Sequence, residues 1–68
     1  MCKAIIAAYQ NGVRVGYVKS VSYKNGSFKL TQDKAFAKGY SSNDRLMYDI
    51  DAISYQGCKN NIVFSMEV

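Results

Sequence analysis

The side chains that could carry out chemistry are few in this chain, and they are scattered. The sequence has no histidine and five acidic residues. Without histidine, the chain lacks the side chain most often used as a general base and as a metal ligand. Asp49 and Asp51 stand two residues apart, so on a helix they point about 200° apart and cannot act as a carboxylate pair. We expect both to lie on a solvated helix surface.

The two cysteines also lack a chemical context. Cys2 and Cys58 have no histidine to activate them and no Cys-x-x-C neighbour that would complete a zinc site. Two reduced, incidental thiols are the favoured interpretation for a cytosolic protein, and a disulfide between them stays open as the alternative. The five glycines are spread along the chain and form no phosphate-binding loop. We therefore expect no enzymatic activity, no metal and no cofactor.

The charge is unevenly distributed along the chain. The formal net charge is +4, from nine basic and five acidic residues. Residues 1–32 carry five of the basic residues and no acid, so the two parts of the chain have charges of +5 and −1. A basic half indicates an acidic partner, either nucleic acid or an acidic protein surface. A charge that serves only solubility is the alternative.

Two Asn-Gly pairs, Asn11-Gly12 and Asn25-Gly26, indicate how the chain is organised. Asn-Gly between strand-like segments is typical of a hairpin with a two-residue type I′ turn. The flanking segments are rich in Val, Ile, Tyr and Phe, as strands are. We predict three antiparallel strands over residues 3–10, 13–23 and 27–32. We expect Gly16 to bend or bulge the second of these strands.

The same two turns predict which residues face each other and which share a face, because side chains alternate along a strand. The predicted pairs are Gln10–Val13, Ala8–Val15, Ile6–Tyr17, Ala4–Lys19, Tyr23–Phe28, Val21–Leu30 and Lys19–Gln32. The expected core face comprises Ile6, Ala8, Val13, Val15, Tyr17, Val21, Tyr23, Phe28 and Leu30. The opposite face comprises Lys3, Ile5, Ala7, Tyr9, Arg14, Gly16, Val18, Ser20, Ser22, Lys29 and Thr31.

The second half of the chain predicts a helix and a final strand. Ser41 and Asp44 fit a Ser-x-x-Asp capping box, which starts a helix over residues 42–56. An apolar stripe with helical spacing follows, and it comprises Leu46, Ile50 and Ile53, with Met47 beside it. Gly57 is expected as the left-handed residue that ends the helix. Residues 61–68 alternate as a strand, with Ile62, Phe64, Met66 and Val68 on one side. Residues 33–40 fit either a short strand or a turn of helix.

These elements predict a single α+β domain over residues 1–68. A four-stranded antiparallel sheet, in the order β-β-β-α-β, is expected to pack one face against a single amphipathic helix. No residues remain to cover the other face. No apolar run approaches the length of a membrane span, and the apolar N-terminal segment is too short for a signal peptide, so we expect a cytoplasmic protein with no membrane partner.

The uncovered face of the sheet is therefore the candidate partner-binding surface. Tyr9 and Arg14 are expected to be cross-strand neighbours there, with Lys29, Lys3 and Lys24 on the same side or at its rim. A ring beside cations is typical of nucleic-acid platforms, and tyrosine and arginine are also enriched in protein hot spots. A solvated sheet face with an ordinary cross-strand pair is the alternative.

One stretch of the chain resembles a known group of proteins. Residues 17–21, Tyr-Val-Lys-Ser-Val, and residues 28–42, Phe-Lys-Leu-Thr-Gln-Asp-Lys-Ala-Phe-Ala-Lys-Gly-Tyr-Ser-Ser, followed by Ile50 and Ile53, resemble small phage-encoded accessory proteins. Several anti-CRISPR proteins share this size and this sheet-plus-helix style. The resemblance implies a host-takeover protein that binds a bacterial defence or replication complex. It assigns no functional residue, because such proteins share no common site.

Three functional hypotheses follow. The leading one is a non-enzymatic, protein-binding inhibitor or modulator, encoded by a phage or a mobile element. It would block a host protein or ribonucleoprotein complex through the basic face of the sheet. The alternative is a small nucleic-acid-binding module. A third hypothesis is a self-associating domain whose last strand pairs through an exposed edge, so that the chain is either a monomer or a homodimer.

Overall fold

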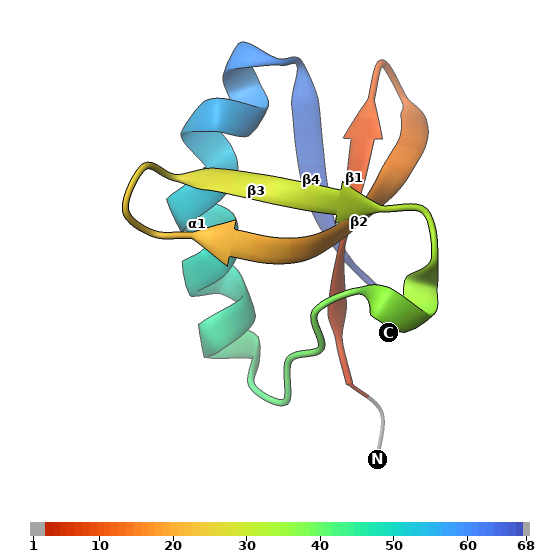
Figure 1. Ribbon diagram of the computed structural model, residues 1–68, viewed down its shortest axis with the longest axis vertical. Helices are drawn as coiled ribbons and strands as arrows, with labels where there is room; N and C mark the ends of the chain where they lie inside the picture. The colour runs from red at the N-terminus through yellow and green to blue at the C-terminus, as the bar shows by residue number, and fades with distance from the viewer. Residues whose placement is uncertain (1–2, 68) are drawn as a thin grey trace.

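The computed structural model describes residues 3–67, which form one antiparallel sheet and one long helix. The elements in chain order are β1 (Ile5–Gln10), β2 (Val13–Ser22), β3 (Ser27–Thr31), the 3-10 helix η1 (Lys34–Phe36), α1 (Asn43–Lys59) and β4 (Ile62–Glu67). The four strands pair in the order β3-β2-β1-β4, and α1 packs on one face of the sheet (Figure 1). The predicted α+β class and element order are confirmed.

The first hairpin follows the predicted register only next to its turn. Asn11 and Gly12 both have positive φ, 56° and 81°, as a type I′ turn requires. Gln10 pairs with Val13 and Tyr9 with Arg14, as predicted. A bulge follows, because the register shifts and Ala8 then pairs with Gly16. The expected bulge near Gly16 is confirmed, and it makes the predicted pairs Ala8–Val15, Ile6–Tyr17 and Ala4–Lys19 wrong.

The second hairpin has a longer turn than the sequence predicts. Ser22 pairs with Ser27, so that residues 23–26 form a four-residue loop instead of a two-residue one. Gly26 has a φ of 65°, and a Cβ atom there would lie 2.9 Å from the carbonyl oxygen of Ala52 in α1. The turn thus packs directly against the helix. The predicted pairs Tyr23–Phe28, Val21–Leu30 and Lys19–Gln32 are wrong, because the longer loop takes Tyr23 out of the ladder.

The first register shift changes the face of Tyr17 and Val18 in β2, and a second shift, between Val18 and Ser20, restores the predicted faces beyond it, so that Val21 packs on the core. An extra residue in one strand reverses the face of every residue beyond it. Val18, predicted on the outer face, is fully buried beneath α1, and Tyr17, predicted in the core face, packs with Ile5 and Ala7 on the opposite side. Two other predicted core residues also lie elsewhere, because Val13 is 64% and Tyr23 46% exposed. Val15 is only half-buried.

The core of the domain lies between the sheet and α1. The buried residues of this core are Ile6, Val18, Tyr40, Leu46 and Ile53, with Ala4, Val21, Phe28, Leu30, Ile50 and Phe64 packed against them. The rings of Phe28 and Phe64 meet edge to face, with 5.0 Å between their centroids. The predicted apolar stripe of the helix is confirmed, although Ile50 is only half-buried and Met47 is 58% exposed.

The second face of the sheet is partly covered, which corrects the expectation that no residues remain to cover it. β2 pairs with β1 only as far as Tyr17 and continues with β3, crossing in front of β1 and β4 (Figure 1). Backbone groups of Ala4 and Val18 are then free to pair with another segment. Tyr40 exchanges two hydrogen bonds with Ala4, of 2.9 and 2.7 Å, and the Lys38 amide donates to Val18 at 3.0 Å. Residues 33–40 are thus a 3-10 turn and a connecting segment that closes over Ile5, Ala7 and Tyr17.

The helix termini differ by a few residues from the prediction. Ser42, and not Ser41, is the N-cap, and its hydroxyl accepts from the Arg45 amide at 3.5 Å. α1 continues past residue 56 to Lys59, so Gly57 lies inside the helix. The left-handed residue after the helix is Asn61, with a φ of 60°. Within residues 3–67, no helix is long and apolar enough to cross a membrane. Val68 and Cys2 lie outside the described residues.

Candidate functional site

Tyr9 and Arg14 lie together on the sheet, as predicted, but Arg14 already has partners. Its guanidinium carbon lies 5.1 Å from the centre of the Tyr17 ring, and its Nη1 is 3.7 Å from Oε2 of Glu67. The Arg14 side chain is 49% exposed. Tyr9 is half-buried against the cluster of Ile5, Ala7 and Tyr17. Tyr9 and Arg14 are therefore held on the surface by neighbouring side chains, and Glu67 balances part of the charge of Arg14.

The three lysines of the predicted surface are spread over other elements. Lys29 pairs with Ser20 in the β2–β3 part of the sheet, and Lys24 lies in the 23–26 turn. Lys3 precedes β1 in the chain, and its side chain lies close to Gly39. All three are exposed. Among the described residues, no ion pair or hydrogen bond joins any of them to Tyr9 or Arg14. The structure thus brings two of the five predicted residues into one contact group.

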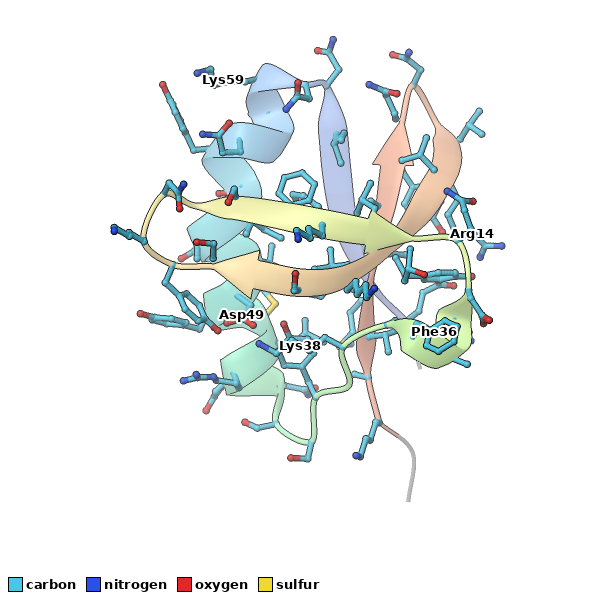
Figure 2. The ribbon with its side chains drawn as sticks, in the orientation of Figure 1. Arg14, Phe36, Lys38, Asp49 and Lys59 are labelled. Carbon is cyan, nitrogen blue, oxygen red and sulfur yellow. The ribbon has the colours of Figure 1, made fainter. Side chains whose placement is uncertain are left out.

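A second polar group is buried where we expected a solvated helix surface. Asp49 of α1 is fully buried, so the expectation for this residue is wrong. Its Oδ1 accepts a hydrogen bond of 2.5 Å from the Tyr23 hydroxyl. Its Oδ2 accepts from the Tyr40 hydroxyl and, at 3.1 Å, from Lys38 Nζ. Figure 2 shows Lys38 and Asp49 beside each other, below β2. A carboxylate can be buried here because three donors from other segments satisfy it.

The donors also determine the charge state of this group. Burial alone would raise the pKa of Asp49, but the hydrogen bonds from Tyr23, Tyr40 and Lys38, together with the lysine charge, outweigh it and lower the pKa below 3.8. Burial would lower the pKa of Lys38, but its hydrogen bond to Asp49 and the carboxylate charge raise it above 10.5. Burial and the bond to Asp49 both raise the pKa of Tyr40. At neutral pH the group therefore holds a carboxylate paired with an ammonium.

Two tyrosine rings and an arginine lie on the surface above this buried group. We call Tyr23, Arg45 and Tyr48 the tyrosine surface. The two ring centroids are 5.9 Å apart, with the ring planes inclined at 50°. The guanidinium carbon of Arg45 is 5.9 Å from the Tyr23 ring and 5.6 Å from the Tyr48 ring. Tyr23 is 46% and Tyr48 60% exposed. The helical spacing of Arg45 and Tyr48 is visible in the sequence, but the approach of Tyr23 depends on the longer turn.

An open groove lies between α1, the start of β4 and the first hairpin turn. Its volume is about 630 Å³, and its lining includes Ile50, Cys58, Phe64 and Gly12. Cys58 is an exposed free thiol. Within residues 3–67, no cluster of three or more His, Cys, Asp or Glu residues could hold a metal ion. The lining of the groove is mostly apolar, with polar side chains from Asn11, Ser54 and Asn61 and no charged side chain.

Comparison of the chain with protein-family models, with curated proteins and with solved structures finds no match. The fold and its surfaces therefore carry the functional argument. They define a small α+β domain with two surface groups in which tyrosine and arginine lie together, one on the sheet and one at the junction of α1 with the β2–β3 turn.

Proposed function

We propose that the protein is a non-enzymatic binding protein that inhibits or modulates a host protein or ribonucleoprotein complex. It docks through the side of the sheet that carries Tyr9 and Arg14. The observation that supports this proposal is that Arg14 is held in place by two contacts, with the Tyr17 ring and with Glu67. An arginine already held in one geometry loses less conformational entropy on binding, and tyrosine and arginine are the residues most enriched in hot spots.

The surroundings of Arg14 also suit a protein partner. Val63 of β4 pairs with Tyr9 from the side opposite to Arg14 and is 68% exposed, so it adds apolar area next to Tyr9. Phe36 of η1 is 64% exposed, and η1 belongs to the segment that closes over the same face of the sheet. Figure 2 shows Phe36 and Arg14 on the same side of the molecule. Apolar side chains around a charged anchor are typical of the centre of a protein interface.

The class of partner comes from the sequence resemblance and from the charge. Small phage-encoded accessory proteins act inside the bacterial cell, so the proposed site of action is the host cytoplasm. A net charge of +4 favours a partner with an acidic surface.

Affinity purification from a nuclease-treated host extract tests this proposal. Tagged wild-type protein, the Tyr9→Ala variant and the Arg14→Gln variant are compared, and co-eluting proteins are identified by mass spectrometry. Lys59→Gln is the matched control, because Lys59 also lies over a tyrosine ring, that of Tyr55, at 5.4 Å. Figure 2 shows it on the opposite side of the molecule from Arg14. We expect one stoichiometric partner complex that both sheet variants lose and the control keeps. Unchanged capture by both sheet variants would reject the proposed surface.

A further inference from the structure

The guanidinium of Arg45 has no acidic partner among residues 3–67. It takes no part in the ion pairs of Arg14 with Glu67 and of Lys38 with Asp49. The guanidinium of Arg45 lies against the two rings of the tyrosine surface. A guanidinium offers five N–H donors, and ring contacts leave those donors free for an anion. We propose that the tyrosine surface binds single-stranded nucleic acid, with Arg45 on a phosphate and the rings of Tyr48 and Tyr23 against bases.

The Tyr23 ring is held by a hydrogen bond, and the Tyr48 ring is carried by the helix α1. The hydroxyl of Tyr23 is held at 2.5 Å by the buried Asp49, while nearly half of the side chain stays exposed. Arg45 and Tyr48 lie three residues apart on α1 and so share one side of the helix. The platform therefore joins a tethered ring on the turn to a ring on a rigid helix. Less conformational freedom is lost when a base stacks on such a surface.

The charges around the rings favour a polyanion. Lys24, the residue after Tyr23, is exposed. Asp49 adds no net negative charge, because Lys38 pairs with it. Asp44 is the nearest acid in the sequence, and it forms no ion pair with Arg45. Arg45 also lies in the first turn of α1, where the helix dipole attracts anions.

The exposed ring faces favour a single strand over the other polyanions. In a duplex, the faces of the bases are stacked on each other and cannot reach a protein ring. An acidic protein segment would satisfy Arg45, but it does not need two inclined, half-exposed rings. This surface differs from the Tyr9–Arg14 face of the proposed function, so each can be tested without the other.

Fluorescence anisotropy with a labelled oligothymidylate of about 20 nucleotides tests the proposal, with the duplex of the same length as the comparison. We expect the single strand to bind at least about tenfold more tightly than the duplex, and Tyr48→Ala or Arg45→Ala to weaken single-strand binding about tenfold. The slope of log affinity against log salt concentration should fall by about one for Arg45→Ala, because one phosphate contact is lost. Tyr48→Phe, which keeps the ring, should bind as the wild type does.

Tyr55→Ala is the matched control, because Tyr55 is 70% exposed on the same helix and lies under a lysine, but forms no ring pair among residues 3–67. Circular dichroism melts establish that each variant is folded. Absence of single-strand binding at low salt would overturn the proposal, as would equal affinity for the duplex or an equal loss in Tyr55→Ala. Competition by polyglutamate as effective as by oligothymidylate would assign the surface to an acidic protein instead. The Arg14→Gln variant should bind the single strand as tightly as the wild type does. This expectation holds even if the proposed function of the Tyr9–Arg14 face is wrong.

Discussion

The hydroxyl of Tyr23, on the turn after β2, donates a hydrogen bond of 2.5 Å to the carboxylate of Asp49, which is buried in α1. This single contact ties the β2–β3 hairpin to the helix. It also holds one of the two rings of the tyrosine surface. Tyr23 thus belongs both to the buried polar group around Asp49 and to the proposed nucleic-acid surface.

Removal of the buried carboxylate should destabilise the domain strongly. Asp49→Ala leaves the hydroxyls of Tyr23 and Tyr40 and the ammonium of Lys38 without their acceptor, and we expect a loss of about 3 kcal/mol in the free energy of unfolding. Urea denaturation measures this loss. Asp51→Ala is the control, because Asp51 is exposed and a surface substitution changes stability by about 0.5 kcal/mol or less. Similar midpoints for the two variants would show that Asp49 adds nothing to stability.

The same group should give stability a dependence on pH at both extremes. The folded-state pKa of Asp49 is lowered from 3.8, so its contribution is present above that pH and is lost as the pH falls through the lower folded-state value. The pKa values of Tyr40 and Lys38 are raised from 10.0 and 10.5, so their contribution is present below about pH 10 and is lost as the pH rises. Thermal melts across the pH range should show a plateau between these limits. The acid-side decline should become shallower in Asp49→Asn, and an unchanged decline would assign it to other carboxylates.

Truncation of the apolar side chains of α1 to alanine should cost different amounts of stability at different positions. Leu46 is fully buried and Ile50 only half-buried at the rim of the groove. Leu46→Ala should cost about 2–5 kcal/mol, close to the whole stability of so small a domain, and Ile50→Ala should cost less. Thermal and urea melts compare the two. A Leu46→Ala protein that melts with the wild type would show that α1 does not cover the core.

Gly57→Ala should destabilise the protein, although alanine is the better helix former by about 1 kcal/mol. Gly57 lies inside α1, where an added Cβ would overlap the Phe64 ring and lie 3.1 Å from the carbonyl oxygen of Ile62. Overpacking of this kind costs about 1–3 kcal/mol. Urea denaturation of Gly57→Ala in the wild type and in a Phe64→Leu background measures the effect, and the smaller side chain should relieve it. A raised midpoint in the wild-type background would contradict this packing.

Charge reversal on the sheet should abolish partner binding with little effect on stability. The Arg14–Glu67 pair is partly exposed, and such pairs contribute at most about 1 kcal/mol. We therefore expect Arg14→Glu with Lys29→Glu to stay folded and to lose the partner complex in the affinity purification. Arg14→Gln with Lys29→Gln serves as the companion variant without repulsion from Glu67. Retained binding in both double variants would move the partner site away from this face.

The amino-acid sequence by itself determined the order of the elements and the contact between Tyr9 and Arg14. Both depend on local chemistry. Asn11-Gly12 adopts the positive φ values of a tight turn, and the residues one and two positions from this turn face each other, as Gln10–Val13 and Tyr9–Arg14 do. The apolar spacing of Leu46 and Ile53 is likewise a property of one helix.

The tertiary structure decided which face of the sheet each residue of β2 occupies. Gly16 indicates that β2 bulges, but the residues that the bulge turns over, and whether a second bulge follows, depend on which side chains can be buried together. The first bulge brings Val18 beneath α1 and moves Tyr17 to the opposite face, and the second returns Val21 to the core side. The position of residues 33–40 follows in turn, because the paths of β1 and β2 leave backbone groups that only this segment reaches.

The burial of Asp49 also could not be predicted from the sequence of the helix alone. An acid on a helix is normally solvated, and only three donors from remote segments make its burial favourable. Tyr23 becomes such a donor because the turn is four residues long. Tyr40 and Lys38 become donors because their segment pairs with Ala4 and Val18. Long-range contacts thus decided where the charges lie, while local patterns determined the elements that carry them.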